Sequence, residues 1–225
     1  MNALDLYAHI EPLIGFYDEY EKLYDEYICI LETLKVQTIL DIGCGNGKFL
    51  RRLRGTKFRA KGIDRSGKMV KLATFLDVEA DKIELKDIKE RFCCATAIGD
   101  VLNYIPQTEL RSFFSDLKSV LKEGGYFLAD INTLSGFEDV ADGLFLKDME
   151  DKFLAIDADF KSTILTTSIT LFEKDNGYYK KFSNTILQYY HDMEIFKNID
   201  GFELINSFDI SMFGDLDKKI LVFKT

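Results

Sequence analysis

The chain has 225 residues, 47% of them apolar and 30% charged, and its 29 basic and 38 acidic side chains give a formal charge of −9. This composition excludes disordered and collagen-like proteins, and no apolar run approaches the roughly 18 residues that span a bilayer. We expect no secretory signal, because the N-terminal residues lack a basic region followed by an apolar one, and the four cysteines lack the spacing of a metal site. We therefore expect a cytoplasmic protein with reduced thiols and no metal centre.

The N-terminal segment, residues 1–34, contains a helical stripe of tyrosines. Tyr17, Tyr20, Tyr24 and Tyr27 recur at three- and four-residue steps, which predicts an amphipathic helix. Such side chains either pack onto a sheet or face a bound ligand. We expect this segment to form a helical cap on the domain that follows.

Strand and helix patterns alternate between residues 36 and 132. Short apolar, β-branched runs predict buried strands, and apolar residues at three- and four-residue steps predict helices. This alternation is typical of a parallel sheet with helices on both faces. Strands are predicted at 36–43, 58–64, 82–88, 91–98 and 125–132, and helices at 47–55, 66–76 and 108–125.

The pattern changes after residue 133. Residues 135–188 contain long alternating runs, and Asp175-Asn176-Gly177 between two of them is a hairpin signal. We expect an antiparallel insert that covers the carboxyl-terminal edge of the main sheet. The chain is then a single domain, residues 1–225, of α/β class: a doubly wound, seven-stranded, mostly parallel Rossmann-like sheet with this insert. A short helix over 191–202 and an antiparallel strand pair, 202–210 and 218–224, complete it.

The most informative stretch is ILDIGCGNG (residues 39–47), in which a buried strand runs into three alternating glycines and then a helix. Glycines there let the backbone turn tightly and approach a ligand. Asp64 lies twenty-one residues after Gly43, at the end of the next strand, where a carboxylate can bond two ribose hydroxyls. Asp41 is costly to bury unless it accepts from a cationic amine or from N–H groups of the loop. A ligand with an ammonium group and a ribose suits both carboxylates.

Nicotinamide or flavin binding is the main competing interpretation of this loop. Its fingerprint is G-x-G-x-x-G, usually preceded by an apolar residue, whereas this loop has G-x-G-x-G with Asp41 two positions ahead. The spacing favours a different nucleoside ligand.

At this point the sequence resembles a known family. ILDIGCGNGKFL resembles the first motif of class I S-adenosylmethionine-dependent methyltransferases, and GIDRSGKMVKLA resembles the second. The resemblance continues through FCCATAIGDVLNYI, VLKEGGYFLADIN and YYHDMEIFKNIDGFEL, and thus covers nearly the whole chain. The insert and the N-terminal YDEY segment are similar to N-methyltransferases of nucleotide-linked amino sugars and to several bacterial enzymes.

The resemblance implies transfer of a methyl group from S-adenosylmethionine to N or O of a small, nucleotide-linked metabolite, with S-adenosylhomocysteine as product. It also implies cofactor contacts. Asp41, Gly43 and Gly45 would lie against the methionine moiety. The remaining implied contacts are Asp64 at the ribose, Arg65, Met69, Asp87 and Ile88 around the adenine, Ala97 beneath the methionine, and Tyr17 over the cofactor.

The sequence gives fewer indications of the residues that would contact the methyl acceptor. Tyr104, Tyr190 and His191 are our candidates for catalytic contacts, and a general base is needed only if the acceptor must lose its proton early. A single histidine near a C-terminal helix is more often structural. The alternative function is a S-adenosylmethionine-binding partner or regulatory protein without transferase activity.

Charge is unevenly distributed along the chain. Residues 1–35 hold eight acids and two bases, whereas residues 48–91 hold fourteen bases and seven acids. A basic segment is a candidate nucleic-acid footprint, but few aromatics interleave with these bases and the chain is acidic. We therefore expect a small-molecule acceptor, no nucleic acid and no membrane, and a monomer or homodimer.

Overall fold

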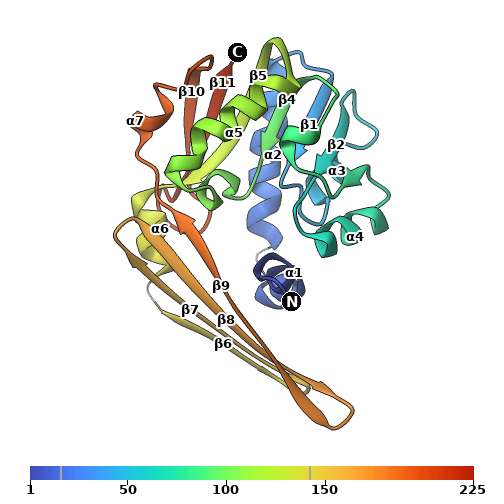
Figure 1. Ribbon diagram of the computed structural model, residues 1–225, viewed down its shortest axis with the longest axis vertical. Helices are drawn as coiled ribbons and strands as arrows, with labels where there is room; N and C mark the ends of the chain where they lie inside the picture. The colour runs from blue at the N-terminus through green and yellow to red at the C-terminus, as the bar shows by residue number, and fades with distance from the viewer. Residues whose placement is uncertain (16, 142) are drawn as a thin grey trace.

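The computed structural model describes residues 1–15, 17–141 and 143–225, and the side chains of Tyr17 and Asp18 also lie outside the described part. It consists of an α/β unit from one end of which a second, elongated sheet projects (Figure 1). In the described part, no helix is long and apolar enough to cross a membrane.

The main sheet has seven strands in the order β10-β11-β5-β4-β1-β2-β3. Neighbours among β1 to β5 are parallel, whereas β11 pairs antiparallel with β5 and β10 antiparallel with β11. This confirms the predicted doubly wound, seven-stranded, mostly parallel sheet with a C-terminal antiparallel pair. The strands are β1 (Thr38–Ile42), β2 (Arg59–Ile63), β3 (Ala80–Asp81), β4 (Phe92–Ala97), β5 (Leu121–Asn132), β10 (Glu203–Ile210) and β11 (Lys218–Lys224).

Apolar side chains fill both faces of this sheet. One cluster, which contains Phe114, Phe127 and Phe223, lies on the face of the sheet that helix α5 (Gln107–Val120) covers. The other, which contains Tyr27 and Phe49, lies on the face that helix α2 (Tyr17–Thr33) covers. Burial on both faces explains why β1 and β4 are continuous apolar runs. The helices are α1 (Ala3–Ile14), α2 (Tyr17–Thr33), α3 (Lys48–Leu53), α4 (Gly67–Phe75), α5 (Gln107–Val120), α6 (Leu134–Val140) and α7 (Met193–Phe196), with 3-10 turns η1 (Leu85–Asp87) and η2 (Val101–Tyr104).

The second sheet is antiparallel, with strand order β6-β7-β8-β9, as the sequence predicts. Asn176 and Gly177 both have positive φ, 51° and 86°, in the two-residue turn between β8 and β9, which is the geometry that favours Asn-Gly in hairpins. One face of this sheet packs on α1 through a shared apolar cluster. Its strands are β6 (Leu144–Met149), β7 (Lys152–Lys161), β8 (Ile164–Asp175) and β9 (Tyr178–Tyr189).

Several element predictions were wrong, among them the end of the helix predicted over 108–125, because α5 ends at Val120 and residues 121–125 belong to β5. Residues 82–88 do not form a strand, because β3 ends at Asp81 and the buried side chains Leu85 and Ile88 have the three-residue spacing of the turn η1. The helix predicted over 191–202 is only α7. The helix α6 was not predicted, although the Thr133 hydroxyl caps it by accepting from Gly136 N at 3.2 Å.

Candidate functional site

The parallel strands β1, β2, β4 and β5 end at one edge of the main sheet, which we call the carboxyl edge. The loop after β1 turns there: Gly43 and Gly45 have φ of 70° and 54°, a region that non-glycine residues rarely adopt. A Cβ on Gly43 would lie 2.8 Å from Val101 Cγ2, whereas a Cβ on Gly45 would meet nothing within 4 Å. Gly43 therefore allows η2 to approach, and Gly45 leaves open space beside the loop.

Asp41, near the end of β1, is 2% exposed. Its Oδ1 accepts a hydrogen bond from Thr96 Oγ1 of β4 at 2.8 Å, and it forms no ion pair with a cationic side chain of the described residues. Burial, with a smaller contribution from the negative charge of Asp64, raises the pKa of Asp41 to about 7 despite the Thr96 hydrogen bond. A carboxylate in this environment is stabilised by any ligand that brings a positive charge.

Asp64 follows β2 and braces the glycine loop. Its Oδ2 accepts from Gly45 N at 2.9 Å and its Oδ1 from Ser66 N at 2.7 Å. Burial raises the pKa of Asp64, and these N–H groups act in the opposite direction. The structure therefore brings Asp41, Gly43, Gly45 and Asp64 together at the carboxyl edge.

The other cofactor residues implied by the resemblance lie in several environments. Met69, on the first turn of α4, is buried, and Ala97 is fully buried at the end of β4. Ile88 is buried in the α5-side core. Arg65 and Asp87 are exposed, with Arg65 Nε 3.2 Å from Glu84 Oε2, and the side chain of Tyr17 lies outside the described residues.

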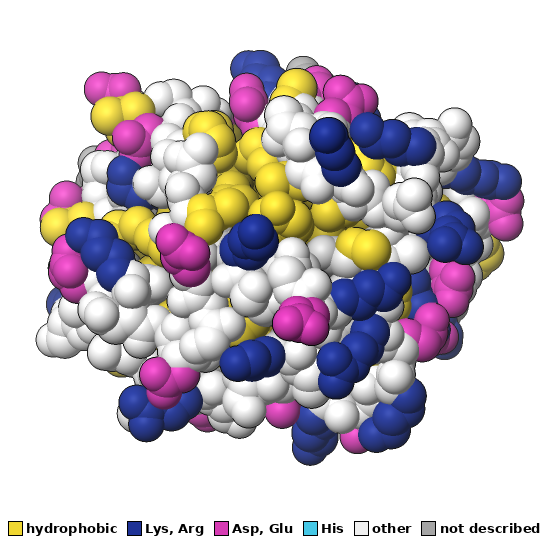
Figure 2. Space-filling view, turned by 90° about the horizontal axis from the view of Figure 1, so that it is seen from above, with side chains coloured by type: hydrophobic (Ala, Val, Ile, Leu, Met, Phe, Trp, Pro, Cys, Tyr) yellow, Lys and Arg dark blue, Asp and Glu magenta, His cyan; other side chains and the backbone are white. Residues whose placement is uncertain are grey.

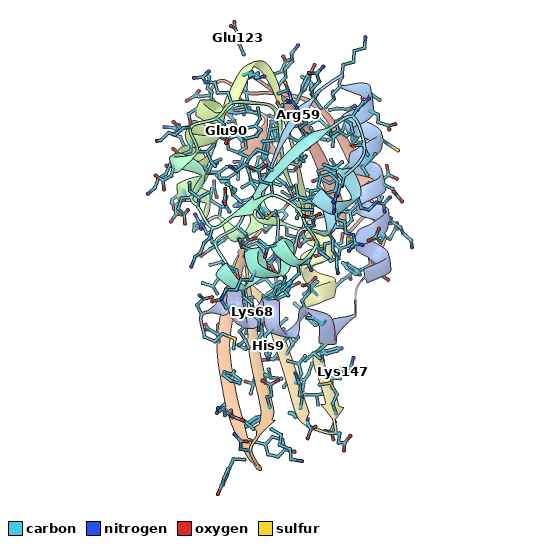
Figure 3. All side chains as sticks on the ribbon, turned by 90° about the vertical axis from the view of Figure 1, so that its right-hand side faces the viewer. His9, Arg59, Lys68, Glu90, Glu123 and Lys147 are labelled. Carbon is cyan, nitrogen blue, oxygen red and sulfur yellow. The ribbon has the colours of Figure 1, made fainter. Side chains whose placement is uncertain are left out.

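Helix α1 lies across the carboxyl edge, between the main sheet and the second sheet (Figure 1, Figure 3). Its Asp5 accepts from Ser66 Oγ at 2.6 Å, and its Glu11 accepts from Asn46 Nδ2 at 2.9 Å. On its other side, His9 contacts Glu173 of β8 at 3.0 Å and also lies against Lys68 of α4 (Figure 3). Helix α1 therefore covers the glycine loop and ties it to the second sheet.

Four tyrosines surround the region below α1. Burial raises the pKa of Tyr7 to about 12 and those of Tyr20, Tyr27 and Tyr104 well above the ordinary value, so all four hydroxyls stay protonated at neutral pH. The negative charge of Asp100 acts on each of them. We call the rings of Tyr7, Tyr20 and Tyr104 the aromatic wall, because aromatic rings can stabilise a positive charge. The ring of Tyr27 packs in the core against Phe49.

A buried polar network lies at the ends of β4, β5 and β11, and the sequence analysis missed it. Lys218 Nζ lies 3.2 Å from Asp130 Oδ2 and 2.9 Å from Asn132 Oδ1, and it is also paired with Asp100. Asp130 Oδ1 accepts from Tyr27 Oη at 2.9 Å and from Gly99 N at 2.8 Å. Burial alone would lower the pKa of Lys218, but the two carboxylates raise it above its ordinary value. One signal could have revealed this network: Asp130 is a carboxylate inside an apolar strand, as Asp41 is.

The two remaining acceptor-side candidates lie where the second sheet joins the main unit. Tyr190 packs edge-on against Phe137, with ring centroids 6.1 Å apart. His191 is 1% exposed, and its Nε2 lies 3.1 Å from the carbonyl oxygens of Leu102 and Ile105. Two carbonyl acceptors require Nε2 to carry the proton, which leaves the buried Nδ1 without a hydrogen-bond partner among the described residues. Burial lowers the pKa of His191.

Some bases of the basic segment pair with acids, both outside the segment and within it. Arg52 of α3 pairs with Glu21 and Asp25 of α2, and Lys61 of β2 lies 3.2 Å from Asp81 and 3.2 Å from Glu90. At the end opposite the second sheet, basic and acidic side chains are interspersed around a band of hydrophobic ones (Figure 2). Arg52 and Lys48, which lies 3.7 Å from Glu11, thus link the basic segment to the acidic N-terminal one. A surface pocket of about 430 Å³ at the starts of β1 and β2 is lined by Lys35, Val36, Gln37, Lys57 and Arg59.

The comparisons with known proteins agree with this architecture. Residues 39–125 match the family model described as a methyltransferase domain. A methyltransferase of Geobacillus sp. (strain WCH70) is 30% identical over 124 residues, and the match spans 50% of this chain and 50% of that relative.

Solved structures extend the similarity to nearly the whole chain. A S-adenosylmethionine-dependent methyltransferase from Clostridium acetobutylicum ATCC 824 matches with a TM-score of 0.74 and 20% identity, covering 98% of this chain and 96% of that one. An amino pentose methyltransferase from Micromonospora echinaspora, solved with S-adenosylmethionine bound, matches with a TM-score of 0.70 and 18% identity over 97% and 96%. A sugar N-methyltransferase from Streptoalloteichus sp. ATCC 53650 gives 0.73 and 16% over 98% and 91%.

Residues 39–125 therefore match a methyltransferase domain, and the chain has the fold of S-adenosylmethionine-dependent methyltransferases. The domain match and the shared fold agree with the resemblance predicted from ILDIGCGNGKFL and GIDRSGKMVKLA.

Proposed function

We propose that this protein is a S-adenosylmethionine-dependent methyltransferase that methylates a nitrogen or oxygen of a small, nucleotide-linked metabolite and releases S-adenosylhomocysteine. The observation that carries the proposal is Asp41. It is a buried carboxylate beside a glycine loop, without a cationic side-chain partner among the described residues. The family match of residues 39–125 and the sugar methyltransferases of the same fold support the activity and the substrate class.

The residues at the carboxyl edge fit such a cofactor. Asp41 would bind its ammonium group, Asp64 its ribose hydroxyls, and Gly45 would leave room for the backbone to approach. Bound there, S-adenosylmethionine supplies a methyl group already activated on a sulfonium. The further contacts that we propose are Gly43 and Ala97 at the methionine, Arg65, Met69, Asp87 and Ile88 around the adenine, and Tyr17 over the cofactor.

The contribution of the chain itself is alignment and exclusion of water. Helix α1 covers the glycine loop through Asp5 and Glu11, and tyrosine rings wall the space below it. On the acceptor side we propose Tyr104, because the negative charges of both Asp100 and Asp64 contribute to the raised pKa of its hydroxyl. We also propose Tyr190 and His191 for the acceptor side. The contacts of Tyr190 with Phe137 and of His191 with the Leu102 carbonyl hold the junction between the second sheet and the main unit.

The proposal is tested by incubating the protein with S-adenosylmethionine and a panel of nucleotide-linked sugars. The panel should contain amino sugars paired with their hydroxyl counterparts, and formation of S-adenosylhomocysteine is measured. We expect turnover with at least one acceptor and, at the same subsaturating S-adenosylmethionine concentration, turnover that is lower by about 10- to 100-fold in Asp41→Asn. Binding of S-adenosylhomocysteine without turnover on any acceptor would favour a non-catalytic binding protein. Failure to bind it at all would reject the proposal.

A further inference from the structure

The buried network at β4, β5 and β11 contains one more carboxylate than ammonium. Lys218 is the buried cation among the described residues, and it faces both Asp100 and Asp130. Burial of a carboxylate without a matching charge is unfavourable. The network can therefore accept one further positive charge.

Among the three charged residues of this network, Asp100 has the most solvent-exposed side chain. Its side chain is 16% exposed, whereas that of Lys218 is 2% exposed and that of Asp130 fully buried. A ligand that brings positive charge to the network can therefore reach it through Asp100.

The backbone holds Asp100 at this place. Asp100 has φ of 66°, a left-handed conformation that is uncommon outside glycine, and its N–H donates to Asp130 Oδ2 at 3.1 Å. The preceding Gly99 packs against the ring of Tyr20, where a Cβ would come within 3.3 Å. The Asp100 carboxylate is thus fixed relative to the aromatic wall.

Asp100 also adjoins the proposed cofactor site. In the sheet β4 lies next to β1, and Thr96 of β4 bonds Asp41 of β1. The negative charges of Asp64, at the end of β2, and of Asp100, just after β4, both contribute to the raised pKa of the Tyr104 hydroxyl. A ligand whose ribose lies at Asp64 and whose amino acid lies at Asp41 extends along the sheet toward Asp100.

We propose that Asp100 binds the amine of the methyl acceptor and takes its proton, so that the acceptor is an amine rather than an alcohol; this rests on the proposed function. The amine binds as an ammonium and first gives a proton to the Asp100 carboxylate, which frees the nitrogen lone pair. Transfer then forms a nitrogen–carbon bond and breaks the carbon–sulfur bond, whose electron pair stays on sulfur. Asp100 returns its proton to water through its exposed side, and the product leaves as the methylated ammonium. An alcohol brings no positive charge before transfer and leaves the excess carboxylate unmatched.

Titration calorimetry with two cofactor analogues tests this without an acceptor. S-adenosylhomocysteine has no group at the position of the methyl, whereas sinefungin carries a positively charged amine there. In Asp100→Asn we expect sinefungin affinity to fall by about tenfold or more, because a charged hydrogen bond is lost. S-adenosylhomocysteine affinity should change by less than about threefold, and the exposed Asp215→Asn is the matched control.

Asp100→Asn should fold, because Lys218 and Asp130 remain as a neutral pair. Asp100→Glu keeps the negative charge but displaces it, so it should lower the sinefungin affinity by an intermediate factor. If Asp100→Asn does not fold, Asp100→Glu provides the test. An unchanged ratio of the two affinities in both variants overturns the proposal for Asp100. Failure of the wild type to bind either analogue instead contradicts the proposed function on which it rests.

Discussion

The two halves of the carboxyl edge hold their buried carboxylates in different ways. At β1 and β2, Asp41 and Asp64 are satisfied by a hydroxyl and by backbone N–H groups, with no cationic side chain of the described residues paired to either carboxylate. At β4, β5 and β11, Asp100 and Asp130 share the ammonium of Lys218. The first half has no positive charge of its own among the described residues, whereas the second has one cation for two carboxylates.

The largest expected effect comes from removing the cation of the second half. Lys218→Met leaves two buried carboxylates facing each other, and it should lower the free energy of unfolding by about 3–5 kcal/mol. Denaturant unfolding measures this, with Lys219→Met as the control, because Lys219 pairs with Asp209 at the surface and should matter by less than about 1 kcal/mol. Equal effects of the two substitutions would show that the second half does not depend on its cation.

In the first half, two glycines should separate stability from binding. Gly43→Ala combines a positive φ with a clash against Val101 and should destabilise by about 2–4 kcal/mol. Gly45→Ala meets no neighbour and should cost about 1–2 kcal/mol of stability, yet weaken S-adenosylhomocysteine binding more than the loss of stability explains. Thermal unfolding with and without this ligand distinguishes the two. The open space at Gly45 is not a ligand site if Gly45→Ala binds as the wild type does.

Asp41→Asn should weaken S-adenosylhomocysteine binding by about 10- to 100-fold, because the ligand ammonium loses its charged partner. The pH dependence has a definite sign. The free protein holds the Asp41 proton below its pKa of about 7, so the wild-type affinity should fall as the pH drops through that value, by up to about tenfold per pH unit. Calorimetry between pH 6 and pH 8 should show this slope in the wild type and a flat profile in Asp41→Asn. A slope that persists in the variant would assign the proton to another group.

The smallest effect is expected outside both halves. Lys147 of β6 donates to the Leu13 carbonyl at 2.8 Å and is exposed. Lys147→Met should change the free energy of unfolding by about 0.5 kcal/mol or less and leave analogue binding unaltered. A larger loss of binding would place the junction of α1 and the second sheet within the site.

The same comparison explains what could be predicted from the sequence. Asp41 lies on β1, the two glycines lie in the loop that follows it, and Asp64 directly follows β2. These two consecutive strands are joined by one helix, so their spacing alone brings these residues together. The strand pattern likewise predicted the sheet and the hairpin at Asn176.

The second half escaped prediction because its residues are far apart in the chain. Lys218 meets Asn132 only through the antiparallel register of β11 on β5, and no local pattern encodes that register. Lys218 begins an apolar run that reads as an ordinary strand start. The short turn η1 was missed for a related reason, since only tertiary burial selects Leu85 and Ile88.

The central claim is that the carboxyl edge binds a nucleoside with an amino-acid ammonium. Its most direct measurement is calorimetric titration of the wild-type protein with S-adenosylhomocysteine and, separately, with NAD. We predict one site for S-adenosylhomocysteine and no binding of NAD. Binding of NAD without binding of S-adenosylhomocysteine by the folded protein would contradict the account.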